Sequence, residues 1–435
     1  MRTQLYNVIL SAAIVAASTV SVHAQFINTV AGNGTAAYTG DGGTALLASF
    51  NGMEGMAVDG AGNIYLADKN NHVIRKIANN GVVSTFAGTG VAGFSGNGGA
   101  ATIAKLNQPS AVATDGAGNV YIADKGNNVV RVVDASGIIR KYAGNGIEGY
   151  SGDNDTAHLG TLSVPTALHL DGAGNLYIAE GGSHVIRKVD AGTHIMHTVA
   201  GTGGFGFSGD GGAATAASFN TPSGVAVDAA GNIYIADALN HRVRKVDAAT
   251  GIVNTFAGTG TPGNSGNAGP ATAANMSYPV SVALDVAGNM YVAERGFHNV
   301  RMVNNSGTIS PVAGSSTPGY SGDGGLATVA TLRAPRFVFV DGWNRIYIGD
   351  QGNNVLRQLS ATAAVGNQVT TSGQFKVYPV PANNNTNLDL TAMTGSNQEA
   401  SLKSNLSEEE ERKKREEEFL KRRREGEDED EDEEE

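Results

Sequence analysis

A unit of about 56 residues occurs six times between Phe26 and Ser360, and this repetition leaves few folds open. The clearest block within a copy reads Asp-x-x-Gly-Asn-apolar-Tyr-apolar-Ala-Asp/Glu. Its leading Asp recurs at steps of 56 or 57 residues, at Asp59, Asp115, Asp171, Asp228, Asp285 and Asp341. Repeats of this length, rich in strand-forming residues and interrupted by Gly, are typical of propellers and solenoids.

One copy predicts four antiparallel strands. In the fourth copy, Val225 and Val227 alternate with small residues, and the Gly-Asn pair that ends at Asn232 predicts a tight turn. Further strands are expected over residues 233–237, 242–246 and 252–257. Six such copies predict an all-β fold, a six-bladed β-propeller with four-stranded antiparallel blades.

The two ends of the repeat region predict how the ring closes. The last copy has only three expected strands after Asp341, whereas residues 26–32 form an expected fourth strand with no blade of its own. We therefore expect the N-terminal strand to pair beside residues 355–359 and to complete the sixth blade. Such closure hides the sheet edges, so the repeats need no capping unit.

The loop and third strand of the fourth copy read Asp237-Ala-Leu-Asn-His-Arg-Val-Arg244, and this segment with its five counterparts resembles the NHL repeat. The resemblance covers residues 26–360. It implies a six-bladed propeller, which agrees with the number of copies. It also implies binding through one propeller face, to protein, carbohydrate or, in cytoplasmic members, RNA. A minority of NHL-like and neighbouring propellers are lyases or lactonases.

Residues outside the repeats predict export. Residues 1–24 combine Arg2, an apolar run and a small-x-small ending, which is typical of a signal peptide, so we expect the propeller to occupy residues 25–360. After a linker at 361–372, residues 373–395 resemble the opening strands of the sorting domain of type IX secretion, with Val380 where that domain usually has Asn. We expect no membrane span and an extracellular or cell-surface location, or the periplasm if the sorting segment does not work.

The charge of the chain lies mostly in its last segment. The net charge is −11, but residues 397–435 hold 9 Lys and Arg against 18 Asp and Glu, which leaves the rest at −2. Blocks of like charge such as those in 396–435 predict disorder or a transient helix. Because the body is nearly neutral, we expect no nucleic-acid partner. We also expect a monomer.

Two residue types stand at a fixed separation in all six copies, an acid and, seven residues later, an arginine. We predict six structural ion pairs within the blades. The alternative is a ring of carboxylates that binds a metal or a cationic ligand. The pairs are Asp68–Arg75, Asp124–Arg131, Glu180–Arg187, Asp237–Arg244, Glu294–Arg301 and Asp350–Arg357.

Two further sets of residues raise the question of a metal. His or Asn precedes each arginine by three residues, at His72, Asn128, His184, His241, His298 and Asn354. Each belongs to a different blade, so we expect it to form a hydrogen bond within its own turn rather than to bind zinc.

The Gly-Asp-Gly-Gly block supplies Asp41, Asp153, Asp210 and Asp323, with Asn97 and Asn267 in the other copies. One carboxylate per loop falls short of the six to eight oxygens that calcium needs, so we expect no metal, with calcium the one cofactor left open. The chain has no Cys to supply a thiolate.

The channel mouth is the candidate ligand site. The residue after the strand-opening proline is expected there, and in the first copy Met53 takes the place of that proline. These residues are Glu54, Ser110, Thr166, Ser223, Val280 and Arg336. One acid, one base and hydroxyls can bind a polar ligand but lack the several acids of a catalytic metal centre. His169 stands where the other copies have Ala or Phe, and we expect it to be buried, neutral and hydrogen-bonded.

From these residues and the resemblance we predict a non-catalytic binding or scaffold module for a protein or carbohydrate partner. Its contact face is formed by the loops between fourth and first strands. The alternative is a lyase or lactonase with a metal at the channel mouth.

Overall fold

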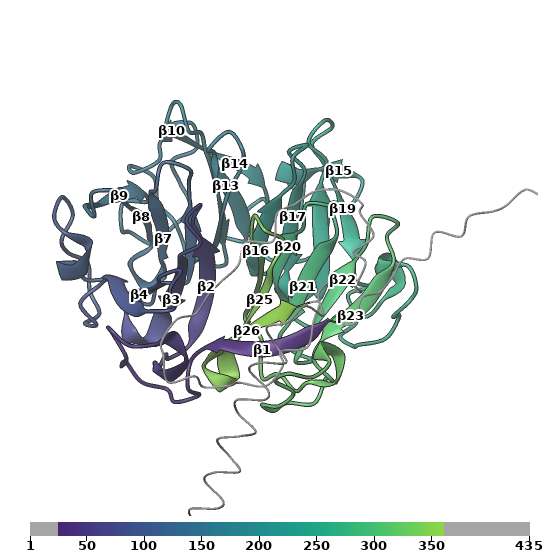
Figure 1. Cartoon of the computed structure of the whole chain (residues 1–435). Helices are drawn as coiled ribbons and strands as arrows, with labels where there is room; N and C mark the ends of the chain where they lie inside the picture. Colours follow the sequence, from purple (N-terminus) through teal and green to yellow (C-terminus); the bar gives the residue numbers. More distant parts are fainter. Residues whose placement is uncertain (1–24, 361–435) are drawn as a thin grey trace, which may run out of the picture. The chain divides into compact units, whose positions relative to one another are not determined.

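Six antiparallel sheets stand around a central axis in the computed structural model, which describes residues 25–360 (Figure 1). The predicted all-β, six-bladed propeller of four-stranded blades is confirmed. The expected signal peptide, the expected linker, the segment expected to resemble a sorting domain and the charged tail all lie outside the described residues. Within residues 25–360, no helix has the length and apolar character needed to cross a membrane.

The first three blades follow one another along the chain, and each runs from an inner strand at the axis to an outer strand. Blade 1 holds β2 (Met53–Val58), β3 (Ile64–Asp68), β4 (Val73–Ile77) and β5 (Val83–Ala87). Blade 2 holds β6 (Ala111–Thr114), β7 (Val120–Asp124), β8 (Val129–Val133) and β9 (Ile139–Ala143). Blade 3 holds β11 (Pro165–Leu170), β12 (Leu176–Glu180), β13 (Val185–Val189) and β14 (Ile195–Ala200).

The other three blades repeat this order, with one exception at the end of the ring. Blade 4 holds β16 (Pro222–Val227), β17 (Ile233–Asp237), β18 (Arg242–Val246) and β19 (Ile252–Ala257). Blade 5 holds β20 (Pro279–Leu284), β21 (Met290–Glu294), β22 (Asn299–Val303) and β23 (Ile309–Ala313). Blade 6 holds β24 (Phe337–Val340), β25 (Ile346–Asp350), β26 (Val355–Ser360) and, as its outer strand, β1 (Phe26–Ala31).

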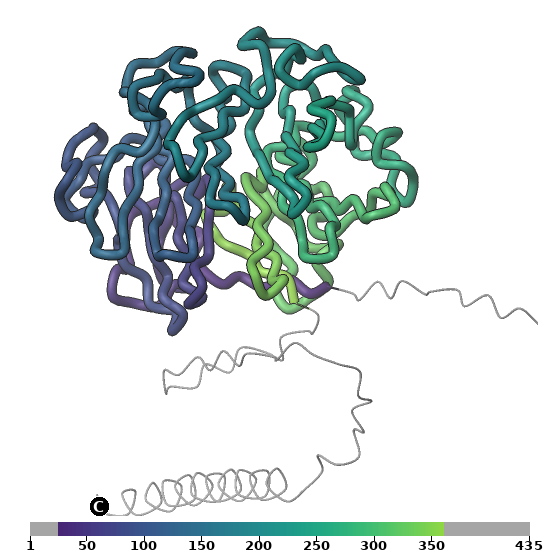
Figure 2. The backbone as a smooth tube through the Cα atoms, turned by 90° about the horizontal axis from the view of Figure 1, so that it is seen from above, coloured from purple at the N-terminus to yellow at the C-terminus, as the bar shows by residue number. Residues whose placement is uncertain are grey.

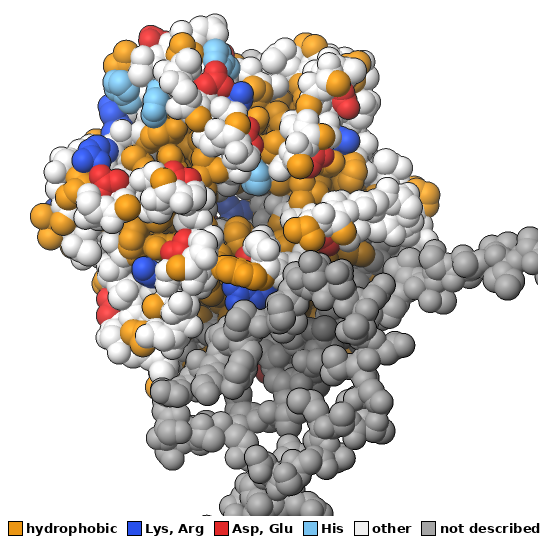
Figure 3. Space-filling model, turned by 45° about the horizontal axis from the view of Figure 1, so that its top comes forward, with side chains coloured by type: hydrophobic (Ala, Val, Ile, Leu, Met, Phe, Trp, Pro, Cys, Tyr) orange, Lys and Arg blue, Asp and Glu red, His pale blue; other side chains and the backbone are white. Residues whose placement is uncertain are grey.

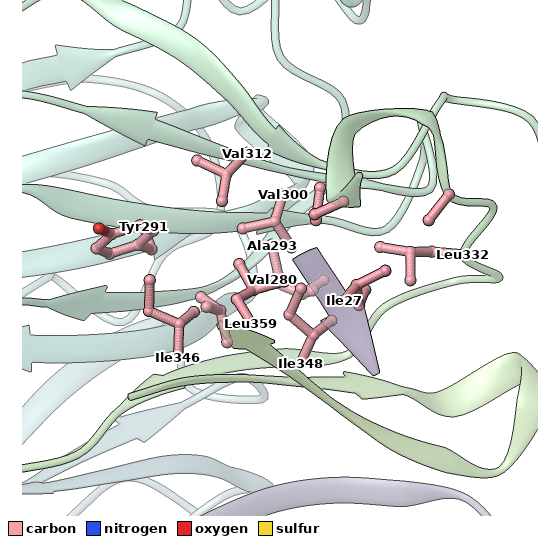
Figure 4. Close-up of a cluster of buried hydrophobic side chains, with 14 residues drawn as sticks. Ile27, Val280, Tyr291, Ala293, Val300, Val312, Leu332, Ile346, Ile348 and Leu359 are labelled. Atoms are coloured by element: carbon pink, nitrogen blue, oxygen red, sulfur yellow. The ribbon is translucent and has the colours of Figure 1, made fainter. Parts of the chain in front are cut away.

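The N-terminal strand closes the ring as the sequence predicts. β1 pairs antiparallel with β26, Phe26 opposite Ser360 and Thr29 opposite Arg357, and the first and last described strands lie side by side (Figures 1 and 2). Ile27 is fully buried in an apolar cluster that also contains Val280 from blade 5 and Ile348 from blade 6 (Figure 4). Closure is therefore held by both backbone pairing and side-chain burial.

The repeated aspartate that opens each copy's clearest block shapes the hairpin between the first and second strands. Asp59 Oδ1 accepts the backbone N–H groups of Ala61 and Asn63 at 3.0 and 2.9 Å, and its Oδ2 accepts Asn63 Nδ2 at 2.7 Å. The same contacts recur with small changes at the other five copies. This motif is thus a turn device rather than a binding motif.

The Ala-Gly pair that ends each fourth strand has a steric cause. Gly88 has φ of +98°, and an added Cβ would lie 2.5 Å from the carbonyl oxygen of His72. The five equivalent glycines also have positive φ and would meet the carbonyl at the same place, at 2.4 to 2.6 Å. Only Gly satisfies both the backbone conformation and the close approach.

The long loops between blades cover the outer sheet edges. The loop before β2 runs along β5, where Val83 N donates to Gly43 O at 2.9 Å and Ala45 N donates to Gly81 O at 2.9 Å. In blades 3 and 4 the loops form short extra strands, β10 (Asp155–Thr156) beside β14 and β15 (Gly212–Ala213) beside β19. The sequence analysis attributed protection of the sheet edges to ring closure alone. The loops between blades protect the outer edges as well.

Single 3-10 turns complete the fold in two positions. In the loops between blades they are η1 (Ala45–Leu47), η3 (Ala101–Ile103), η5 (Ala214–Ala216), η7 (Ala271–Ala273) and η8 (Ala327–Val329). Between second and third strands they are η2 (Lys69–Asn71), η4 (Lys125–Asn127), η6 (Ala238–Asn240) and η9 (Gln351–Asn353). The second set lies at the end of the propeller where the inner strands begin, since Met53 at the start of β2 pairs with Asp68 at the end of β3.

Candidate functional site

The six acid–arginine pairs lie inside the blades, where sequence reasoning placed them. Every arginine of the set is fully buried. The nitrogen–oxygen distances range from 3.3 Å for Arg301–Glu294 to 3.9 Å for Arg131–Asp124. Each pair joins neighbouring second and third strands of one blade. None of the twelve residues lines the central cavities described below.

A second acceptor completes the environment of most of these arginines. Arg75 Nη2 contacts Asp41 Oδ1 at 2.7 Å, and the equivalent acids are used in the same way by Arg187, Arg244 and Arg357. In blade 2 Asn97 takes the place of the acid, with its Oδ1 accepting from Arg131 Nη2 at 2.8 Å. The loop acids considered as calcium ligands are therefore engaged by guanidinium groups.

The aromatic residue of the same loops covers the guanidinium. Its ring lies 4.7 to 5.4 Å from the guanidinium carbon in five blades, with Tyr38, Phe94, Tyr150, Phe207 and Tyr320. Such stacking adds a favourable cation–π contact. Burial raises the pKa of the acids behind the arginines, to about 6 at Asp68 and about 7 at Asp124, against the opposing effect of the guanidinium and of amide donors.

The His and Asn residues of the third-strand loops join adjacent blades. His72 Nδ1 accepts the backbone N–H of Gln108 in the next blade at 3.1 Å, and His184, His241 and His298 make the same contact at 2.9 to 3.1 Å. Asn128 and Asn354 do so through Oδ1 at 3.0 and 3.1 Å. The expectation that these residues bond their own turn was wrong, because the acceptor faces the neighbouring blade. Within residues 25–360, no three His, Asp or Glu side chains gather as metal ligands would.

The residues that open the inner strands line a central cavity of about 340 Å³. All six predicted mouth residues do so: Glu54, Ser110, Thr166, Ser223, Val280 and Arg336. The ring is hollowed at its centre, and basic side-chain atoms are visible in the hollow (Figure 3). The six positions carry five different residue types, with Ser at both 110 and 223, whereas the acid–arginine pairs are repeated in every blade.

A second cavity of about 380 Å³ forms the mouth and contains cations that sequence reasoning missed. Glu54, Thr166, Ser223 and Arg336 line both cavities, whereas Lys69, Lys125 and Arg295 line only the mouth. Each of the three directly follows the acid of an acid–arginine pair in the sequence. The signal was present in the sequence, since this position carries Lys69, Lys125, Gly181, Ala238, Arg295 and Gln351 while its neighbours repeat.

Glu54 is the one carboxylate among the residues of the mouth and is nearly buried. Its Oε1 lies 2.9 Å from Lys69 Nζ and 3.6 Å from Arg336 Nε, and its Oε2 lies 3.9 Å from Lys125 Nζ. Burial alone would raise the pKa of Glu54, but Arg336, Lys125 and Lys69 outweigh it and hold the pKa below its ordinary value. The Oε2 atom has no hydrogen-bond partner.

His169 lies on β11 and lines the central cavity rather than the mouth. Burial lowers its pKa, although Asp171 and the backbone of Val227 act in the opposite direction. The lowered pKa favours the neutral imidazole, but the side chain is half-buried rather than buried as expected. Arg336 lines the same cavity.

Comparison with known proteins supports the repeat type. The Teneurin NHL domain family matches residues 28–93 and 205–262. Protein SUPPRESSOR OF QUENCHING 1, chloroplastic, of Arabidopsis thaliana is 30% identical over 270 residues, 59% of this chain and 25% of that protein. NHL repeat-containing protein 2 of Gallus gallus is 28% identical over 225 residues, 46% of this chain and 30% of that protein. The chain thus spans less than a third of the length of these relatives.

Solved structures show the same fold. An auxiliary nutrient binding protein from Bacteroides thetaiotaomicron superimposes with a TM-score of 0.56 at 17% identity, over 77% of this chain and 76% of that chain. The closed ring of six four-stranded sheets defines a six-bladed β-propeller. Its repeats are similar to those of the Teneurin NHL domain family and of NHL repeat-containing protein 2.

Proposed function

We propose that this protein is an exported, non-catalytic binding module that contacts a protein or glycan partner through the face carrying the channel mouth. The observation that carries the proposal is the contrast between the symmetric frame and the asymmetric mouth. Repeated residues are used for turns, ion pairs and seams between blades, whereas the mouth residues differ from blade to blade. Functional sites on repeat proteins typically use such differences.

The size and chemistry of the mouth support ligand binding. A cavity of about 380 Å³ falls within the usual range of about 300 to 1,000 Å³ for small-molecule sites. One fold neighbour is named an auxiliary nutrient binding protein, and capture of a soluble nutrient is compatible with this cavity. Export itself rests on the sequence of residues 1–24.

The full-length protein can be tested on a combined glycan and protein array. Gln351→Trp, in the wall of the mouth, is expected to abolish binding because the larger side chain fills the cavity. Ser306→Trp, on an exposed hairpin between β22 and β23, is the matched control and should bind as wild type does. Binding that survives Gln351→Trp would show that another surface is used.

The enzyme alternative is tested on the same preparation by metal analysis. Stoichiometric calcium or zinc whose removal also abolishes a hydrolytic or lyase activity would replace the binding proposal. The expected result is binding that a chelator leaves unchanged, because the mouth offers a single carboxylate and hard cations need several oxygen ligands.

A further inference from the structure

We propose that the channel mouth binds an anionic, hydroxylated ligand of the uronate-sugar class, with its carboxylate on Lys125 and Arg336 and a hydroxyl on Glu54. The inference rests on the proposed binding function and names the ligand class for the same site. It follows from the charge of the mouth, from its unsatisfied acceptor and from the hydroxyl groups around it.

The mouth carries more positive than negative charge. Its lining residues include four cations, Lys69, Lys125, Arg295 and Arg336, and one carboxylate, Glu54. The remaining lining residues are uncharged. Burial lowers the pKa of Lys125, and Arg336 and Lys69 lower it further while Glu54 opposes them. A bound anion would relieve this repulsion among cations.

The inner wall of the mouth offers hydrogen-bond acceptors. The Glu54 side chain is only 6% exposed, and its Oε2 has no hydrogen-bond partner although buried polar atoms ordinarily have one. Thr166 Oγ1 donates to Pro222 O at 2.8 Å and Ser223 Oγ donates to Thr221 O at 3.1 Å. Because their protons are used in this way, these hydroxyls present lone pairs to a ligand and match hydroxyl donors.

Acidic sugars satisfy both parts of the site. A neutral sugar would leave four cations with one carboxylate between them. An inorganic phosphate carries its negative charge on one compact group, so it cannot contact the cations and keep that charge away from Glu54. A uronate carries its charge on one substituent and hydroxyl donors on the others. Tyr278 also lines the mouth and adds an aromatic side chain, a residue type common in such pockets.

The test is isothermal titration of the full-length protein with D-galacturonate and D-glucuronate at low salt. The comparison probes are the neutral methyl ester of each uronate and inorganic phosphate. The free acids should bind about tenfold or more tightly than the esters, because a hydrogen bond to a charged group is worth about 1.5 to 3 kcal/mol. Binding should weaken as salt is added.

Two variants with the same charge change locate the site. Lys125→Gln should weaken uronate binding about tenfold or more. Lys76→Gln, on the third strand of blade 1, removes one cation away from the mouth and should leave binding unchanged. Circular dichroism and the melting temperature establish that both variants fold.

The outcomes separate this inference from the proposed function. Esters that bind as well as acids, phosphate that binds as well as uronate, or an equal response of the two lysine variants would each overturn the ligand class. If no uronate binds while the array shows a ligand blocked by Gln351→Trp, the ligand class is wrong and the binding function stands. If neither uronates nor the array show binding at the mouth, both fail.

Discussion

The four histidines between blades make the propeller's stability depend on pH in a way that can be isolated. The perturbation is the quadruple replacement His72→Asn, His184→Asn, His241→Asn and His298→Asn. Asn is the natural comparison because Asn128 and Asn354 make the equivalent contact through Oδ1. All six residues have φ between 51° and 57°, a conformation that Asn adopts readily.

Protonation removes the acceptor that each histidine contributes. The Nδ1 atom accepts a backbone N–H only while it is unprotonated. Burial lowers the pKa of all four histidines, and nearby arginines lower it further at His241 and His298. A group whose pKa is lower in the folded state binds protons more readily when unfolded. Stability is therefore lost as the pH falls from about 6.5 toward the folded-state pKa.

The magnitude follows from the hydrogen bonds. A net hydrogen bond contributes about 0.5 to 1.5 kcal/mol, and the lower end applies because these rings are partly exposed. Four contacts therefore correspond to about 2 kcal/mol. We expect the quadruple variant to be close to wild type in stability at pH 7.5 and more stable by about 2 kcal/mol at pH 5.

Urea denaturation at each pH, followed by circular dichroism, measures the difference. The buried acids whose pKa burial raises are present in both proteins, so their contribution to the pH profile cancels. The reasoning fails if the difference between variant and wild type does not change between pH 7.5 and 5. It also fails if the variant is already several kcal/mol less stable at pH 7.5, since Asn would then not replace His.

Three other predictions concern single positions. Arg244→Ala should destabilise the protein by about 3 to 5 kcal/mol in thermal or urea denaturation, because it leaves a buried acid without its partner; unchanged stability with lost ligand binding would instead make the ring a site. Gly88→Ala should cost clearly more than the control Gly98→Ala, whose φ is also positive but whose added Cβ meets nothing within 4 Å; equal unfolding energies would contradict the steric argument. Glu54→Gln should make sulfate bind more tightly by titration, since the mouth loses its one carboxylate, and an unchanged affinity would place the anion elsewhere.

Much of the fold was accessible from the sequence because the repeat supplies the same information six times. The count of copies, the unpaired N-terminal strand and the strand alternation near Val225 together determine a closed ring of six blades. The acid–arginine pairs were found from constant spacing, since neighbouring strands fix which residues lie opposite each other. At these positions the constant spacing in the sequence corresponds to the pairing of the second and third strands within each blade.

Contacts between blades were harder to predict because sequence spacing describes one blade at a time. The partner of His72 is the N–H of Gln108, 36 residues further along the chain, and periodicity says nothing of how one blade rotates against the next. The covering of the outer edge by the loop around Gly43 was missed for the same reason. Both are relations between repeats, so they depend on the twist and packing of whole sheets.

The candidate site was only partly predictable, because cations of the mouth come from the loops between second and third strands as well as from the inner strands. Position 54 and its counterparts were identified from their place at the start of each first strand, after a proline in five copies and after Met53 in the first, and they line the channel. Lys125 was overlooked because it directly follows Asp124, which belongs to an acid–arginine pair with a structural role. In a repeat protein, however, some positions differ from copy to copy while the residues beside them repeat. The fold of each blade does not require a particular residue at such a position. When such positions lie at the same end of every blade, ring closure brings them to one place, and at this mouth Lys69, Lys125 and Arg295 line one cavity with Glu54.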